Sequence, residues 1–126
     1  MATNWFLAID GDDIGRHLEV YVITENKNKL RELSQEFENL INELFNQINK
    51  NPSIKVLLHG GDSILLEMPR SEIETTVNLI RTTSRGTSFT FSGGYGKTMR
   101  DAYLALKLAK ATGKNKIIPF TPETLR

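Results

Sequence analysis

Cysteine is absent from this 126-residue chain, which excludes disulfide bonds and metal sites built from thiolates. No stretch approaches the roughly 18 consecutive apolar residues of a membrane-spanning helix. Charge begins at Asp10, before any long apolar run, so we expect no signal peptide. Neither sign of charge is in large excess, because 16 Lys and Arg residues against 15 Asp and Glu residues leave a formal net charge of +1. These absences predict a protein of the reducing cytoplasm, with no direct binding to membranes or nucleic acid.

The length fits a single domain over residues 1–126, and we find no linker, repeat or low-complexity segment. Apolar side chains three or four residues apart predict a long amphipathic helix over 26–49. Gly60-Gly61 between two apolar runs predicts a β-hairpin. Similar patterns predict strands over 4–10, 54–58, 63–68, 87–95 and 115–120, and further helices within 11–22, over 71–83 and over 98–112. The helix over 71–83 would begin with a capping box of Ser71 and Glu74, and the helix over 98–112 would be capped by Thr98.

The predicted element order is βαββαβ followed by an extra αβ, which indicates an α+β fold of the ferredoxin-like type. We expect an antiparallel-rich central sheet with helices on one face. In this topology the first and third strands are antiparallel neighbours at the centre of the sheet. Asp10 ends the first strand and Asp62 begins the third. The two carboxylates are therefore predicted to meet, although about fifty residues separate them.

Two carboxylates at one strand junction repel each other unless a shared proton or a divalent cation neutralises them. Mg²⁺ and Mn²⁺ prefer oxygen ligands and often take only one or two carboxylates, together with substrate phosphates. Gly11, Gly60 and Gly61 would let the backbone approach a bulky ligand. Asp and Gly are also the usual residues of turns, so a purely structural role stays open.

A second group of residues suggests phosphate binding. The stretch "SGGYGKT" leads into a helix N-terminus, where free N–H groups attract anions. Lys110 and Lys114, on or just past the same helix, are four residues apart, on one face. Both features have ordinary alternatives, namely a flexible turn and a solvated helix end.

Three stretches together resemble the motifs of GGDEF-type nucleotide cyclases. "AIDGDDIG" resembles their D-x-D-x-F stretch, and "HGGDSIL" resembles the GGDEF turn. "FSGGYGKTMRDAYLALKLAKATGKNKI" resembles their C-terminal helix and the strand after it. The small size and the "DGDDIG" form are most similar to the minimal CRISPR polymerase family (mCpol). That family is similar to the palm domain in the large subunit of type III CRISPR complexes.

The resemblance implies a palm fold that binds nucleoside triphosphates with two divalent ions per site, Mg²⁺ or Mn²⁺. Asp10 and Asp62 would be the catalytic carboxylates and metal ligands, with the Gly11 carbonyl as a further metal ligand. The resemblance assigns contacts with the nucleotide to Gly11, Asp12, Asp13, Ile14, Gly15, Gly60, Gly61, Ser63, Lys110 and Lys114. Ser63 is a departure, because cyclases and the CRISPR palm carry an acidic residue there.

The implied activity is nucleotidyl transfer that yields a cyclic dinucleotide from purine triphosphates, with ATP as the first guess. It would need a homodimer with opposed sites. The family is associated with antiphage defence, in which a separate membrane effector receives the signal. Three other functions remain open from the sequence: a nucleotide sensor without catalysis, which Ser63 favours, a palm-fold GTP hydrolase, and an interaction module with acidic turns.

Overall fold

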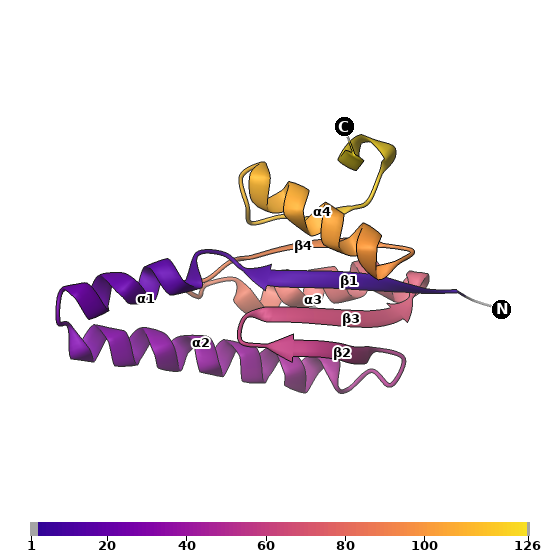
Figure 1. The fold of residues 1–126 in the computed structure, drawn as a ribbon. Coiled ribbons are helices and arrows are strands. Elements are labelled where there is room, and N and C mark those ends of the chain that lie inside the picture. The colour runs from indigo at the N-terminus through magenta and orange to yellow at the C-terminus, as the bar shows by residue number, and fades with distance from the viewer. Residues whose placement is uncertain (1–2, 126) are drawn as a thin grey trace.

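The computed structural model describes residues 3–125, which form one five-stranded sheet with four α-helices packed around it (Figure 1). The strands are β1 (Asn4–Gly11), β2 (Lys55–Gly60), β3 (Ser63–Pro69), β4 (Phe91–Gly96) and β5 (Ile117–Pro119). The helices are α1 (Ile14–Ile23), α2 (Lys27–Ile48), α3 (Ile73–Ser84) and α4 (Met99–Ala111), with short 3-10 turns at Arg70–Glu72 and Pro122–Leu125.

The strand order is β2-β3-β1-β4-β5, with β1 antiparallel to both β3 and β4. The first four strands have the arrangement of a ferredoxin-like βαββαβ unit. The added α4–β5 segment places β5 parallel to β4 at the sheet edge. The predicted α+β palm-like fold with an antiparallel-rich sheet is thus confirmed.

The helices cover both faces of this sheet, which corrects the expectation of one face. Leu7 and Ile9 of β1 pack into the main core with apolar residues of α2 and α3. Ala8 points the other way and packs against Ala102 and Leu106 of α4. Figure 1 shows α4 on the far side of the sheet from α2, and shows α1 and the first half of α2 projecting beyond the strands.

Glycine in β4 explains how α4 lies so close to the sheet. A Cβ atom added at Gly94 would lie 2.3 Å from the backbone nitrogen of Leu106 and 2.5 Å from the Ala102 carbonyl oxygen. Both atoms belong to the backbone of α4, so neither can rotate away. Gly94 and Gly96 of "SGGYGKT" therefore serve helix packing, whereas Gly93 is required by the Ala8 carbonyl and Ile117 of β5. They do not form a phosphate loop beside Asp10, because Gly96 pairs with Phe6 at the opposite end of β1.

Two predicted boundaries differ from the structure for identifiable reasons. The Ser71–Glu74 capping box is wrong, since α3 begins at Ile73 and the Glu74 carboxylate instead accepts a 2.7 Å hydrogen bond from Arg70. Strand β4 begins at Phe91, later than residue 87. The preceding segment is tied to α2, because the Ser88 backbone N–H and hydroxyl both donate to Glu36. The predicted Thr98 cap is confirmed by its bond from the Asp101 N–H, at 3.0 Å.

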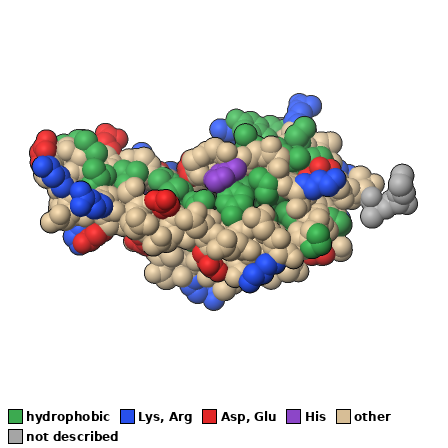
Figure 2. All heavy atoms as spheres, turned by 90° about the horizontal axis from the view of Figure 1, so that it is seen from below, with side chains coloured by type: hydrophobic (Ala, Val, Ile, Leu, Met, Phe, Trp, Pro, Cys, Tyr) green, Lys and Arg blue, Asp and Glu red, His purple; other side chains and the backbone are tan. Residues whose placement is uncertain are grey.

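Charges of both signs are interspersed over the face seen in Figure 2, with no continuous basic stripe on it. Within residues 3–125, no helix combines the length and the apolar character needed to cross a bilayer.

Candidate functional site

The end of β1 lies between two strands and next to the β2–β3 turn. Asp10 is opposite Ser63 of β3 and Ser92 of β4. The backbone N–H of Gly11 donates to the Asp62 carbonyl, with 3.1 Å between nitrogen and oxygen. Asp62 itself lies in the turn, one residue before β3 begins. The structure therefore brings Asp10 and Asp62 together as the topology predicted.

The two carboxylates interact electrostatically. Partial burial raises the pKa of Asp62 above its ordinary value, and the negative charge of Asp10 raises it further. Lys110 opposes this shift without cancelling it. A cation held between the two carboxylates would relieve their repulsion.

Gly11 is required by packing at this junction. A Cβ atom there would lie 2.7 Å from Cγ1 of Ile14 and 3.1 Å from Cβ of Asp62. Any larger residue would push Asp62 away from the end of β1 or displace Ile14 from the core. Burial of Ile14 in that core leaves its backbone, at the first turn of α1, for any contact with a nucleotide.

Ser63, which departs from the acidic residue of the cyclases, is engaged with Asp10. Its hydroxyl donates a 2.7 Å hydrogen bond to Oδ1 of Asp10. The bond fixes the orientation of that carboxylate and leaves Oδ2 directed toward Lys110, 3.5 Å from the ammonium nitrogen. Ser63 thus acts on Asp10 from the neighbouring strand.

Lys110 reaches the same place from α4. Its ammonium donates to the Gly11 carbonyl oxygen at 2.7 Å and to Oδ1 of Asp12 at 2.9 Å. Close packing holds α4 against β4, and the C-terminal part of the helix therefore lies beside the end of β1. Lys110 therefore lies beside the acidic residues at the end of β1.

Asp12 is a buried clamp, with only 5% of its surface exposed. Its carboxylate accepts hydrogen bonds from Thr90 and Ser92 hydroxyls, from Lys110, and from the Asn115 backbone N–H, at 2.7 to 3.0 Å. Burial alone would raise the pKa of Asp12, but the bonds from Ser92, Lys110, Thr90 and Asn115 outweigh burial and lower it. Both of its oxygens are therefore already used within the protein.

Thr90, Ser92 and Asn115 were not among the residues that the sequence singled out. They lie 78 to 103 positions from Asp12, and no local pattern connects them to it. Asn115 adopts a left-handed backbone conformation, with φ 51°, that aims its N–H at both Asp12 and Ser92. Only the three-dimensional structure reveals this part of the site.

Asp13 and Lys114 form a second ion pair beside the first. The carboxylate of Asp13 accepts a 2.7 Å hydrogen bond from Lys114, which lowers the pKa of Asp13. Both residues have positive φ values, 57° and 63°. Asp13 precedes the first turn of α1, and Lys114 lies beyond α4, which ends at Ala111, so the pair links the start of α1 to the loop after α4. Lys110 and Lys114 therefore do not share one face of a helix, which corrects the prediction.

The other glycines that were predicted to contact the nucleotide have open space where a side chain would lie. No heavy atom would lie within 4 Å of a Cβ added at Gly15, Gly60 or Gly61. Gly61 has φ 62°, which the tight β2–β3 turn requires and which glycine adopts without strain. His59, just before the turn, packs against Phe45 of α2 with 4.3 Å between ring centroids. This contact gives His59 a structural role.

The oxygen atoms at the end of β1 fit a divalent cation. Asp10 and Asp62 supply carboxylates, and Gly11 supplies a carbonyl that already attracts an ammonium. Among residues 3–125 no group of three or more His, Cys, Asp or Glu side chains converges for metal binding. Mg²⁺ commonly binds through one or two carboxylates and completes its shell with phosphate oxygens and water. The donor set therefore suits an ion that arrives with a triphosphate.

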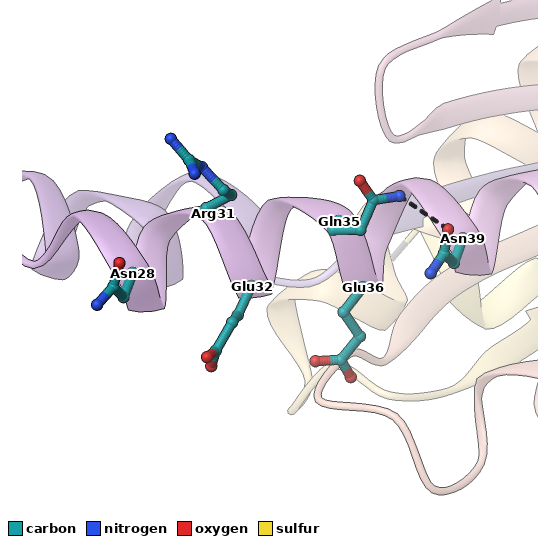
Figure 3. A pocket seen from close by; sticks show the side chains of 6 residues that line it. All are labelled: Asn28, Arg31, Glu32, Gln35, Glu36 and Asn39. Carbon is teal, nitrogen blue, oxygen red and sulfur yellow. Dashed lines mark hydrogen bonds between the residues drawn. The ribbon is translucent and has the colours of Figure 1, made fainter.

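A separate hollow of about 660 Å³ lies along α2 and carries no comparable chemistry. Figure 3 shows its lining residues along a single helix, with Gln35 donating to Asn39. Its lining comes from α2 alone, with no residue from β1 or the β2–β3 turn.

Residues 6–120 match the family model mCpol, described as the minimal CRISPR polymerase domain. The chain belongs to this family. A comparison with curated proteins gives no match. The minimal CRISPR polymerase domain is, by its name, a polymerase-type nucleotidyltransferase domain. The matched region contains both carboxylates, the glycine turn and both lysines at the end of β1.

Proposed function

We propose that this mCpol domain is a metal-dependent nucleotidyltransferase that joins nucleoside triphosphates into a cyclic dinucleotide and releases pyrophosphate. One observation carries the proposal. Two carboxylates, a carbonyl oxygen and two lysines from four segments of the chain converge at the end of β1. Oxygen donors for a cation beside ammonium groups for phosphate are what phosphoryl-group chemistry requires.

Asp10, Asp62 and the Gly11 carbonyl would hold two Mg²⁺ or Mn²⁺ ions. When bound, such ions lower the pKa of an attacking hydroxyl and offset the charge of the phosphates. Ser63 keeps Asp10 in one orientation through its 2.7 Å hydrogen bond. Lys110 and Lys114 would bind the triphosphate, for which each must exchange its present carboxylate partner for phosphate oxygens.

In the proposed reaction, a ribose hydroxyl oxygen of one nucleotide forms a bond to the α-phosphorus of a second. The bond between that phosphorus and the bridging oxygen breaks, and pyrophosphate leaves with the electron pair. The hydroxyl proton passes to solvent. The contribution of the protein is to align the two nucleotides and to neutralise charge. In a second such step, a ribose hydroxyl of the other nucleotide attacks the remaining α-phosphorus, which closes the ring and releases a second pyrophosphate.

Ring closure needs two nucleotides in opposed orientations, for which we propose a homodimer with facing sites. ATP is the first substrate to test, and antiphage signalling to a separate membrane effector is the proposed setting. Ser63 in place of an acidic residue also supports a second candidate, a nucleotide sensor that binds without turnover.

The deciding experiment is incubation of the purified protein with each ribonucleoside triphosphate, alone and mixed, with Mg²⁺ or Mn²⁺. Products are identified by mass spectrometry. A cyclic dinucleotide that disappears with EDTA is the expected result and also identifies the base. Intact triphosphates, together with binding detected by calorimetry, would contradict the synthase and favour the sensor.

A further inference from the structure

A groove of about 480 Å³ opens between α4 and the face of the sheet that α2 and α3 do not cover. Its volume falls within the range usual for small-ligand sites. Its walls come from β1, β2, β3 and α4 and include Asp10, Leu58, Leu65, Met99, Tyr103 and Lys107.

The apolar part of this groove is largely exposed. Leu58 of β2 is 55% exposed, and Met99 and Tyr103 of α4 are 53% and 52% exposed. These side chains come from two elements that both line the groove. Exposed apolar side chains that line one groove are typical of ligand and protein binding sites.

The groove is continuous with the candidate site. Asp10 and Ser63 form part of its wall, and Asp10 shares its face of β1 with Ala8, which packs on α4. A ligand in the groove would therefore extend from Tyr103 toward the carboxylate proposed to hold metal.

Tyr103 and Lys107 supply recognition chemistry at the other side of the groove. The Lys107 ammonium lies 5.0 Å from the centroid of the Tyr103 ring. Asp10 and Lys107 are the charged residues among those that line the groove. An aromatic ring, aliphatic walls and one cationic donor suit a flat heterocycle with ring-nitrogen or carbonyl acceptors.

We propose that this groove binds the heterocyclic base of a nucleotide whose sugar and phosphates lie at Asp10. The inference rests on the proposed function and adds a position for the base. The base lies against Tyr103, Leu58 and Met99, and Lys107 donates to an acceptor on its edge. A second copy of the chain would cover the same apolar residues, and the test below distinguishes it from the base.

The test measures binding separately from turnover. Calorimetry with Mg²⁺ compares ATP with inorganic tripolyphosphate, which has the phosphates and lacks the base. Tyr103→Ala should weaken ATP binding by about 5- to 150-fold, the range for loss of one base–aromatic stack, and leave tripolyphosphate binding unchanged. Tyr103→Phe should retain ATP binding. Tyr21→Ala, on α1, is the matched control and should change neither.

Four outcomes would overturn the proposal. Unchanged ATP binding in Tyr103→Ala would place the base elsewhere. Equal weakening of both probes would indicate a structural role for Tyr103. A change of oligomeric state in Tyr103→Ala by sedimentation, with ATP binding kept, would assign the groove to a second copy. If the unaltered protein bound tripolyphosphate but none of the four triphosphates more tightly, no base site would exist. A protein that binds ATP in the groove without making product would instead contradict only the synthase.

Discussion

The Lys110 ammonium donates a 2.7 Å hydrogen bond to the carbonyl oxygen of Gly11. The same oxygen is proposed as a metal ligand, and Oδ2 of Asp10 lies 3.5 Å from the same nitrogen. An ammonium and a divalent cation cannot share these oxygens without repulsion. In the proposed complex with metal ions, Lys110 would therefore move toward the triphosphate.

Replacing Lys110 should separate metal binding from nucleotide binding. Lys110→Met should bind Mn²⁺ about 3- to 10-fold more tightly without nucleotide. The Lys110 ammonium would no longer compete with the ion for these oxygens, and a part-buried ion pair contributes on the order of 1 kcal/mol. Its affinity for ATP should fall. Lys114→Met is the matched control, because Lys114 contacts Asp13 and not Gly11. Equal Mn²⁺ affinity in Lys110→Met and the unaltered protein would contradict this competition.

Removing the charge of Asp62 should abolish turnover and stabilise the fold. Asp62→Asn should reduce the rate more than about 100-fold. Replacing a residue that only orients a metal ligand usually reduces activity about 10- to 100-fold, so the larger loss is expected for a direct ligand. The raised pKa of Asp62 means that its ionisation disfavours the folded state. Stability that is present below the unfolded pKa is therefore lost as pH rises through the folded pKa.

Asp62→Asn should accordingly be more stable than the unaltered protein at neutral pH in EDTA. The difference should shrink as pH falls below about 4, where the unfolded carboxyl group is also protonated. Thermal unfolding across pH measures it. Glu67→Gln removes a carboxylate from the far end of the same hairpin and should leave turnover intact. Full activity in Asp62→Asn would rule out the proposed metal site.

Asp12 should matter for stability in the opposite direction. Asp12→Asn leaves the ammonium of Lys110 and three further donors without their charged acceptor, so it should destabilise the protein by about 2–4 kcal/mol at pH 7. Because its folded pKa is lowered, this stabilisation is present above the unfolded pKa and is lost as pH falls through the folded value. Denaturant unfolding at pH 7 and pH 3 should show the difference narrowing.

Asp13→Asn is the comparison for Asp12, since Asp13 has its charged contact with Lys114 at a more exposed position. We expect a much smaller loss of stability for it. Similar losses in the two variants would show that the buried clamp has no special role.

Ser63 should support catalysis through Asp10. Ser63→Ala removes the 2.7 Å hydrogen bond to Oδ1 of Asp10 and should reduce the rate about 10- to 100-fold, as for other residues that orient a metal ligand. Ser63→Thr keeps a hydroxyl and should restore most of the rate. An apparent Mn²⁺ affinity measured from rates should weaken in the alanine variant alone. If alanine and threonine variants behaved alike, the hydroxyl would not be the cause.

Gly94 should be among the least replaceable residues. Gly94→Ala brings a methyl group against the backbone of α4 and should destabilise the protein by about 3 kcal/mol or more. Gly15→Ala, where the added atom meets open space in a helix, should be neutral or stabilising by up to about 1 kcal/mol. Thermal unfolding of the two variants side by side is the measurement. An unaltered midpoint for Gly94→Ala would contradict the close packing.

The meeting of Asp10 with the β2–β3 turn could be predicted from the sequence because it follows from topology alone. Once β1 and β3 are central antiparallel neighbours, the end of one lies beside the start of the other. The Asp12 clamp could not be predicted, because Thr90, Ser92 and Asn115 are ordinary polar residues without any spacing signal. Their role depends on the left-handed turn at Asn115 and on the register of β4.

The glycines of β4 show a different limit of sequence reasoning. Close approach to a phosphate and close approach to a helix demand the same residue, so "SGGYGKT" was compatible with both. The register decides between them, since Gly96 pairs with Phe6 and not with Asp10. The placement of helices on both faces of the sheet was missed for a similar reason. Leu7, Ala8 and Ile9 point to alternate faces of β1 but are all apolar, so the sequence of β1 does not show which face a helix covers.

The contact between Gly94 and α4 has a consequence for how this domain can change. One rigid helix carries Lys110 at the proposed phosphate end and Met99, Tyr103 and Lys107 along the groove. Any substitution that lifts α4 off β4 would widen the groove and withdraw Lys110 in a single motion. Mutations on the helix surface can alter one function at a time, whereas mutations beneath it alter both. Selection for a new substrate is therefore expected to change the exposed side chains of α4 and to leave Gly94 unchanged.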